Sequence, residues 1–378
     1  MRMLYLTLAD IDDRSYGGAI RSHQIREALL QVGEVDTLVI HGAPSTRLDT
    51  EWQPGRVKRA LYARGSGRLH QLGQRLAIRR HVAAVVRAGG YDVIVARYIG
   101  LALFVPLRAW TRLVVDADDM FKSISPNLPV SLRVRAALGL RNFAARLALT
   151  RAAHVWYVNP ADGARLKARA LSWVPNTVLA PDAGRARPAP VPGRILMVGY
   201  FDHPPNARGL LWFATEVLPS LVAEFPQVEL HVVGRYPSIL AATLHRDAIH
   251  FHGFVDALAA EYDRAALVVA PIQSGGGTQI KVIDALVHGR PLVASRFAHA
   301  GFDRELTNGL HLRVADAAAA WVRQCAELLR DPKAAEAMAE RGRCAVAAGG
   351  LQRVNDTVRD TVIAIAGRGA DRQRTASA

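Results

Sequence analysis

The residues with the clearest chemical potential lie close together in the second half of the chain. Three consecutive glycines precede a threonine, a lysine and an aspartate: Gly275, Gly276, Gly277, Thr278, Lys281 and Asp284. Glycine allows close approach to a ligand, and a helix that starts there presents unpaired N–H groups to an anion. Because the helix dipole stabilises an anion by only about 0.3–1 kcal/mol, or about 2 when partly buried, a diphosphate also needs a cation. We therefore expect Lys281 to contact a diphosphate and Asp284, on the same helix face, to accept hydrogen bonds from sugar hydroxyls.

The flanking sequence predicts the elements that position these residues. Leu267 to Ala270 is a short apolar run typical of a buried parallel strand. Thr278 is the expected N-cap of a helix that ends at Gly289, and residues 292–294 form the next strand. The alternative interpretation is a flexible glycine turn beside a surface ion pair between Lys281 and Asp284. The Walker pattern is absent, which argues against a P-loop ATPase.

The pattern GGGTxxKxxxA followed by Gly-Arg-Pro-Leu-Val resembles the donor-site signature of GT-B glycosyltransferases. It is most similar to the retaining family 4, and in particular to a bacterial exopolysaccharide branch. That family usually carries two glutamates separated by seven residues, and the matching positions here are Gly276 and Asp284. The resemblance implies a nucleotide-diphosphate sugar as donor, such as a UDP- or GDP-sugar, with no cofactor and no bound metal.

The resemblance also implies the fold. We expect an α/β protein with two Rossmann-like domains facing across a cleft and a C-terminal helix that crosses back to the N-terminal domain. The expected parts are an acceptor-binding domain, a linker rich in Pro and Ala, a nucleotide-sugar-binding domain, a crossover helix and a disordered tail: residues 1–176, 177–193, 194–350, 351–366 and 367–378.

Further donor-side residues are expected where strands of the second domain end. Gly199 follows a predicted strand and precedes a Pro-Pro-Asn step that resembles the same bacterial branch. Arg235 follows the next strand and is a candidate phosphate or cleft residue. The resemblance implies that Phe254 and Val255 lie beside the nucleotide base, while the ordinary alternative is a core strand end.

Acceptor-side candidates lie in the first half. Gly17 and Gly18 precede a predicted helix and resemble the acceptor-facing first loop of GT-B enzymes. Arg97 ends one predicted strand, and Asp118 and Asp119 follow another. We interpret one of these aspartates as an acceptor-side base or hydroxyl ligand, with Asp119 the catalytic candidate; a helix cap is the alternative. The dinucleotide fingerprint GxGxxG is not met, which argues against a nicotinamide enzyme.

The formal net charge of +15 is concentrated in the first half. Residues 1–180 hold 26 Lys and Arg against 13 Asp and Glu, whereas the remainder holds 22 against 20. Residues 56–88 and 131–151 are predicted as basic helical regions. Such a surface suits an anionic membrane; a solvated helix or a general preference for arginine is the alternative. No helix-turn-helix or finger pattern accompanies the charge, so nucleic acid is not an expected partner.

The location and activity follow as expectations. The two cysteines, Cys325 and Cys344, imply no disulfide framework, Met1 to Leu8 is too short for a signal peptide, and no apolar run approaches the roughly 20 residues that span a bilayer. We expect a cytoplasmic enzyme, at the inner face of the plasma membrane, that transfers a sugar to a glycan or lipid-linked acceptor in bacterial surface polysaccharide synthesis. The alternatives are a sugar-nucleotide epimerase of the same architecture and a degenerate subunit that binds nucleotide and activates a partner.

Overall fold

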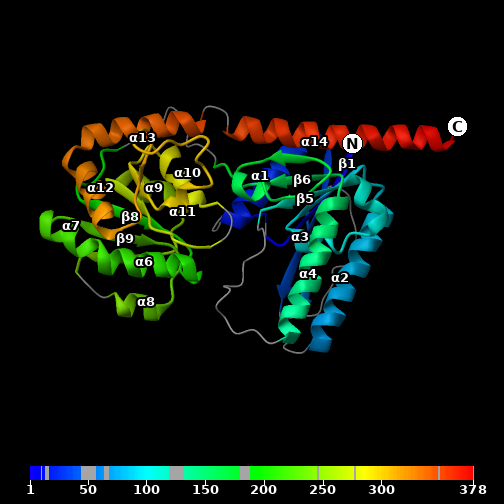
Figure 1. The fold of residues 1–378 in the computed structure, drawn as a ribbon, viewed down its shortest axis with the longest axis horizontal. Coiled ribbons are helices and arrows are strands. Elements are labelled where there is room, and N and C mark those ends of the chain that lie inside the picture. Colours follow the sequence, from blue (N-terminus) through cyan, green and yellow to red (C-terminus); the bar gives the residue numbers. More distant parts are fainter. Residues whose placement is uncertain are drawn as a thin grey trace. The chain divides into compact units, whose positions relative to one another are not determined.

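The computed structural model divides into two compact units, residues 1–175 with 352–378 and residues 176–351. The structure describes residues 1–9, 11–12, 17–43, 57–63, 68–118, 132–178, 188–244, 247–275, 278–347 and 350–377. Each unit contains one parallel sheet with helices around it (Figure 1). None of the helices in these ranges is both long and apolar enough to cross a bilayer.

The N-terminal unit has a seven-stranded parallel sheet in the order β3-β2-β1-β4-β5-β6-β7. Its strands are β1 (Arg2–Thr7), β2 (Glu34–Ala43), β3 (Val57–Ala63), β4 (Val93–Arg97), β5 (Leu113–Ala117), β6 (His154–Tyr157) and β7 (Leu171–Trp173). Its helices are α1 (Gly17–Leu30), α2 (Arg68–Gly89), α3 (Ile99–Ala102), the 3-10 helix η1 (Leu107–Arg112), α4 (Leu132–Arg151), α5 (Pro160–Gly163) and most of α14 (Gly350–Ser377).

Alternating side chains of this sheet enter two separate cores, as the two-residue period of a strand requires. Leu4 and Leu6 of β1 pack in a core that also contains residues of α2 and α4. Met3 and Tyr5, on the opposite face, pack with α1 and with the apolar stripe of α14. The indole N–H of Trp156 donates to the Thr361 hydroxyl at 3.2 Å, which fixes α14 to β6. The prediction that the last helix returns to the first unit is confirmed.

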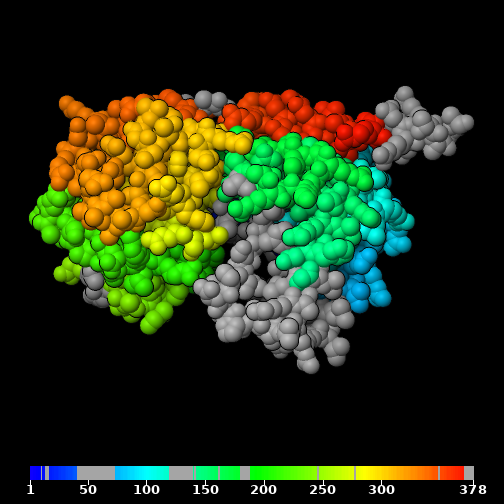
Figure 2. Space-filling view, viewed as in Figure 1, coloured from blue at the N-terminus to red at the C-terminus, as the bar shows by residue number. Residues whose placement is uncertain are grey.

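The C-terminal unit repeats the arrangement with a six-stranded parallel sheet in the order β10-β9-β8-β11-β12-β13. Its strands are β8 (Arg194–Val198), β9 (Glu229–Val233), β10 (Ile249–Gly253), β11 (Leu267–Ala270), β12 (Leu292–Ala294) and β13 (Arg313–Val314). Its helices are α6 (Pro204–Glu216), α7 (Leu218–Glu224), α8 (Ser238–Thr243), α9 (Leu258–Arg264), α10 (Ile280–Val287), α11 (Arg296–His299), α12 (Ala318–Arg330) and α13 (Pro332–Ala347). In the space-filling view, α12 and α13, coloured orange, form much of the visible surface of this unit (Figure 2).

Two sequence predictions of secondary structure were wrong. Residues 57–63, predicted as part of a basic helical region, form β3, which pairs with β2 in parallel. Pairing with an existing sheet satisfies backbone hydrogen bonds of this segment, and such long-range contacts override the local pattern that suggested a helix. Residues 367–377, predicted as a disordered tail, continue α14. Their low hydrophobicity suggested disorder, but adding residues to a helix that is already packed avoids the cost of nucleation.

Candidate functional site

The strand order of each sheet creates one position where ligands bind in open α/β proteins. In the C-terminal unit β8 lies between β9 and β11. The chain therefore adds β9 and β10 on one side of β8 and then returns to add β11 on its other side. The topological switch point, where ligands bind in open α/β sheets, therefore lies at the carboxyl ends of β8 and β11. Gly275 lies in the segment that follows β11, and Gly199 follows β8 directly. The fold thus brings these two predicted segments to one end of one sheet.

Gly275 is the described member of the glycine run, and its backbone adopts φ +142°. This conformation is essentially restricted to glycine, so the residue type is required by the turn that leaves β11. Gly276 and Gly277 lie outside the described residues. The following helix, α10, begins at Ile280 with Gln279 as its N-cap residue.

The predicted N-cap role of Thr278 is wrong, because the helix begins one residue later than the sequence suggested. The Thr278 hydroxyl instead accepts a hydrogen bond from the Asn176 side-chain amide at 2.5 Å. Its methyl group packs against Gly301, where an added Cβ would lie 2.4 Å from the Thr278 Cγ2. Since no side chain caps α10, its first N–H groups receive no competing side-chain oxygen from the cap residue.

Lys281 lies in the first turn of α10, and its amino group donates to the side-chain carbonyl of Asn206 at 2.8 Å. The Asn206 amide is itself oriented, because it donates to the Tyr200 carbonyl at 2.8 Å. Burial of the amino group lowers the pKa of Lys281 to about 7. This cation is therefore held at the switch point by a neutral partner, and a negatively charged ligand would stabilise its protonated form.

Asp284 lies one turn further along α10 and is partly buried. Burial raises the pKa of its carboxyl group to about 6, while the neighbouring Tyr262 hydroxyl acts in the opposite direction. The fully buried Tyr262 ring stacks on the imidazole of His288 at 4.7 Å, and the His288 Nε2 lies 4.0 Å from the carboxylate. Lys281 and Asp284 therefore do not form the surface ion pair of the alternative interpretation, since each interacts with other groups.

The remaining donor-side residues lie at the carboxyl ends of β8, β9 and β10. The Gly199 N–H donates to the Val233 carbonyl at 3.0 Å, and Gly234 adopts φ +121° with no room for a Cβ beside the Gly199 carbonyl. Arg235 is 71% exposed and pairs with Asp202 at 2.8 Å. Phe254 is 64% exposed, and Val255 is partly buried. The exposed Phe254 ring is available for stacking, whereas Val255 packs against the hydrophobic core.

In the N-terminal unit, three of the predicted acceptor-side residues are joined by one guanidinium. Arg97, fully buried at the end of β4, donates to the Gly18 carbonyl and the Asp118 carboxylate, and to the Ser22 hydroxyl at 2.6 Å. Gly17 begins α1. Asp119 lies outside the described residues. Because both terminal nitrogens donate inside the protein and the side chain is fully buried, Arg97 organises the loop after β5 and the start of α1 and has no exposed face for an acceptor.

Several neighbouring residues were not identified from the sequence. Arg21 forms a bidentate pair with the buried Asp116, with distances of 2.9 and 2.6 Å, and the carboxylate raises the pKa of the guanidinium. Tyr98 follows Arg97 in a positive-φ conformation of 75°, which is strained for a residue with a Cβ. Asn206, the partner of Lys281, belongs to the Pro-Pro-Asn step that the sequence did mark, but this signal did not reveal its contact. Asn176, the partner of Thr278, was not identified.

Comparison with known proteins gives a family match within the C-terminal unit and a consistent fold for the chain. Residues 192–331 match the family described as "Glycosyl transferases group 1". The chain is 18% identical to sucrose-phosphate synthase from Thermosynechococcus elongatus, covering 100% of both chains with a TM-score of 0.69. It is 12% identical to WaaG, described as a glycosyltransferase involved in lipopolysaccharide biosynthesis, covering 95% of this chain and 99% of that one with a TM-score of 0.66. It is 14% identical to HepE of Anabaena, solved with UDP and glucose, covering 95% and 98% with a TM-score of 0.63.

A curated relative from Klebsiella pneumoniae, an uncharacterised 44.6 kDa protein in the cps region, is 26% identical over 101 residues. The match covers 24% of this chain and only 26% of that protein. The solved structures, in contrast, are covered almost completely, and the predicted GT-B fold is confirmed. The matched family region contains the whole switch point of the C-terminal unit, from β8 to α12.

Proposed function

We propose that this chain, a glycosyltransferase with the GT-B fold, transfers a sugar from a nucleotide-diphosphate sugar to a glycan or lipid-linked acceptor. The observation that carries the proposal is the Lys281 amino group, oriented by Asn206 in the first turn of α10 at the switch point. Two proteins of the same fold support the choice of donor and acceptor: HepE was solved with UDP and glucose, and WaaG acts in lipopolysaccharide biosynthesis.

In the reaction, the bond between the sugar anomeric carbon and the diphosphate oxygen breaks, and the bonding electron pair leaves with the diphosphate. The acceptor hydroxyl forms the new bond and gives up its proton. The protonated Lys281 and the first N–H groups of α10 would stabilise the charge that develops on the diphosphate, which is electrostatic preorganisation at a helix terminus. Such stabilisation does not require a bound metal or a cofactor at the transfer site.

Asp284 would accept hydrogen bonds from hydroxyls of the donor, held in place by Tyr262 and His288. Its pKa of about 6 leaves it mainly ionised at neutral pH, so it is available as an acceptor. Phe254 and Val255 would border the base, and Arg235 would approach the phosphates by exchanging its exposed pairing with Asp202. On the acceptor side, Asp118 or Asp119 would receive the hydroxyl proton, with Asp118 positioned by Arg97.

Retention of configuration belongs to this proposal because the donor-site signature resembles a retaining family. Gly276 stands where that family usually has a glutamate. The proposed mechanism therefore assigns no step to a carboxylate at this position. The same substitution favours the second candidate function, a degenerate subunit that binds the nucleotide and activates a partner.

The surface polysaccharide role rests on the relative from the cps region and on WaaG. A lipid-linked acceptor would bring the enzyme to the cytoplasmic face of the membrane, where the basic N-terminal unit would contact anionic lipids.

The test is a thermal-shift panel of UDP-, GDP-, ADP- and dTDP-sugars, followed by detection of donor hydrolysis with the sugar that binds. Binding at 100 times the dissociation constant stabilises the folded state by about 2.7 kcal/mol, which is readily detected as a rise in melting temperature. A shift with slow hydrolysis supports the transferase. A shift with no hydrolysis at saturation supports the degenerate subunit, and a change of the free sugar nucleotide into its epimer supports the epimerase. No shift with any donor would contradict the proposal.

A further inference from the structure

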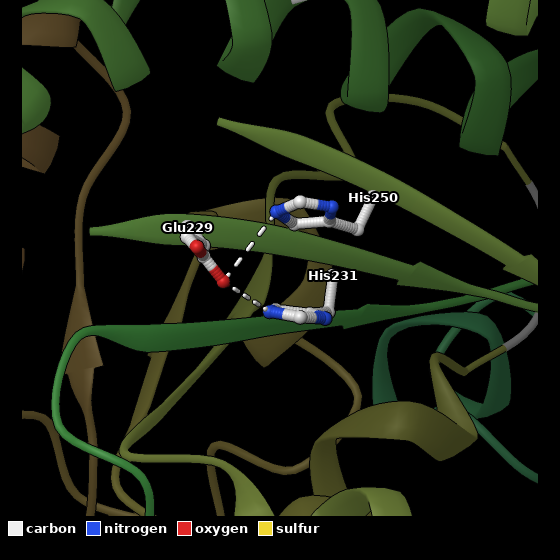
Figure 3. A group of neighbouring side chains, drawn as sticks. All are labelled: Glu229, His231 and His250. Carbon is white, nitrogen blue, oxygen red and sulfur yellow. Dashed lines mark hydrogen bonds and ion pairs between the residues drawn. The ribbon is translucent and has the colours of Figure 1, made fainter. Parts of the chain in front are cut away.

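A second group of chemically active side chains lies at the opposite end of the C-terminal sheet. Glu229 and His231 of β9 point to the same face, since they are two residues apart in one strand. His250 of β10 is the direct neighbour of His231 in the parallel register. Figure 3 shows the carboxylate and the two imidazole rings converging from the two strands. This cluster lies toward the amino ends of β9 and β10, whereas the glycine loop lies at the carboxyl end of β11.

The distances within the cluster suit a tetrahedral metal ion. The Glu229 Oε2 lies 3.1 Å from the His231 Nε2 and 3.4 Å from the His250 Nε2, and the three ligand atoms all lie within 4.8 Å of one another. Tetrahedral zinc binds such atoms at about 2.0–2.2 Å, which places neighbouring ligand atoms roughly 3.3 Å apart. The side chains would therefore need little rearrangement to bind one ion.

The His250 Nε2 provides an independent observation. This nitrogen is buried from solvent, yet it makes no hydrogen bond among the residues that the structure describes. Its separation of 3.4 Å from the Glu229 carboxylate is too long and poorly aligned for a good hydrogen bond. A buried imidazole nitrogen without a hydrogen bond costs free energy, and a metal ion between it and the carboxylate would satisfy it.

The contacts that His231 makes with residues outside the cluster are also compatible with metal binding. Its Nδ1 lies 2.8 Å from the His252 Nε2, so an Nδ1–H donating to His252 would leave the His231 Nε2 lone pair toward Glu229. A hydrogen bond from the second ring nitrogen is the usual way in which a metal-binding histidine is oriented. The charge of Arg194, which lies 3.2 Å from the His231 Nε2, is balanced by Glu261. Metal binding would require Arg194 to release His231 and to keep its bond to Glu261.

We propose that Glu229, His231 and His250 form a binding site for a single divalent transition-metal ion of the zinc type, with water as the fourth ligand. Glu229 is 52% exposed, so the ion can enter from solvent. The site joins the edge strand β10 to β9 and stabilises the C-terminal unit, and it takes no part in glycosyl transfer. It does not depend on the function proposed above.

The experiment is a titration of the untagged full-length chain, freed of metal by chelator and dialysis, with zinc sulfate alone in a calorimeter. We expect one ion per chain and a rise in melting temperature on zinc addition. Cobalt(II) in place of zinc should give the intense visible absorption of tetrahedral coordination. Glu229→Gln and His250→Gln should each weaken zinc binding at least about tenfold.

His154→Gln is the matched control, because His154 is a partly buried histidine that contacts Ser172 at 2.9 Å in the N-terminal unit. This variant should bind zinc as tightly as the unchanged chain. Glu229→Gln replaces an exposed side chain with one of similar shape, and its melting curve without metal checks that it folds. The proposal is overturned if the unchanged chain binds no zinc, or if Glu229→Gln and His250→Gln are folded and bind zinc with unchanged affinity.

Discussion

The amino group of Lys281 donates to the side-chain carbonyl of Asn206 at 2.8 Å, although the two residues are 75 positions apart in sequence. One belongs to α10, which follows β11, and the other to α6, which follows β8. The contact therefore joins the two segments that border the switch point. Because the partner is a neutral amide, the lysine charge is oriented without being neutralised, which leaves it available for an anionic leaving group.

Replacement of Lys281 by alanine should reduce sugar transfer while the protein stays folded. Loss of one well-placed donor to a developing oxyanion typically lowers kcat by about 10²–10³-fold. The measurement is kcat and KM for the donor that the thermal-shift panel identifies, with circular dichroism as the folding check. Lys167→Ala is the matched control, since Lys167 is exposed in the N-terminal unit and should keep normal turnover. Unchanged turnover in Lys281→Ala would remove this residue from the mechanism.

Binding of the nucleotide diphosphate should take up a proton at pH 8. The pKa of Lys281 is lowered to about 7, so most of the free protein carries a neutral amine at this pH, whereas a bound diphosphate favours the ammonium form. The affinity for the nucleotide diphosphate should accordingly fall by up to about tenfold per pH unit above pH 7, until the pH reaches the pKa of Lys281 in the complex. Calorimetry in buffers of different ionisation enthalpy measures the proton uptake directly.

Asn206→Asp provides the control for this pH dependence. A carboxylate beside Lys281 favours the charged amine and raises its pKa, so the free protein would already be protonated at pH 8. Proton uptake on binding should then largely disappear. If the unchanged chain binds the diphosphate without uptake, the lowered pKa of Lys281 plays no part in binding.

The sequence predicted the local geometry of this site better than its long-range contacts. An apolar run, a glycine loop and a helical period placed Lys281 in the first turn of α10, because each is a property of a few neighbouring residues. The Asn206 partner was not predicted, since a local pattern does not specify which polar atoms of distant segments meet. The Arg21–Asp116 pair, 95 residues apart, was missed for the same reason. Thr278 was assigned one position too early, and helix ends are decided by such small differences.

Replacement of Gly234 by alanine should destabilise the C-terminal unit. Gly234 adopts φ +121°, and an added Cβ would lie 2.0 Å from the Gly199 carbonyl oxygen, which is backbone and cannot move aside cheaply. Strain and overpacking together should lower the free energy of unfolding by at least about 2 kcal/mol. Chemical denaturation measures this change. Gly73→Ala in α2 should have the opposite sign, a gain of about 0.5–1 kcal/mol, because an added Cβ there meets open space in a helix.

Replacement of Arg21 by alanine should strongly destabilise the N-terminal unit. The guanidinium is buried and also donates to the Val174 carbonyl at 3.0 Å, so its loss leaves the Asp116 carboxylate and a backbone acceptor without this partner. Breaking a buried pair on one side typically costs about 3–5 kcal/mol. The unfolding free energy of Arg21→Ala should fall by this amount, while the exposed Arg165→Ala should change by less than about 0.5 kcal/mol. Equal stability of the two variants would contradict a structural role for the pair.

Contact with an anionic membrane should depend on the exposed face of α2. Arg75, Arg79 and Arg80 are exposed in this helix, and Leu76 beside them is 48% exposed. A basic face with a partly exposed apolar side chain suits a lipid interface, and each arginine near an anionic surface contributes about 1 kcal/mol. The variant Arg79→Glu/Arg80→Glu should therefore sediment at least tenfold more weakly with vesicles of phosphatidylglycerol. The variant Arg208→Glu/Arg323→Glu, which reverses two exposed charges of the C-terminal unit, serves as the control for net charge. If both variants lose vesicle binding equally, the attraction depends on the net charge of the whole chain. If both keep vesicle binding, α2 is excluded as the contact surface.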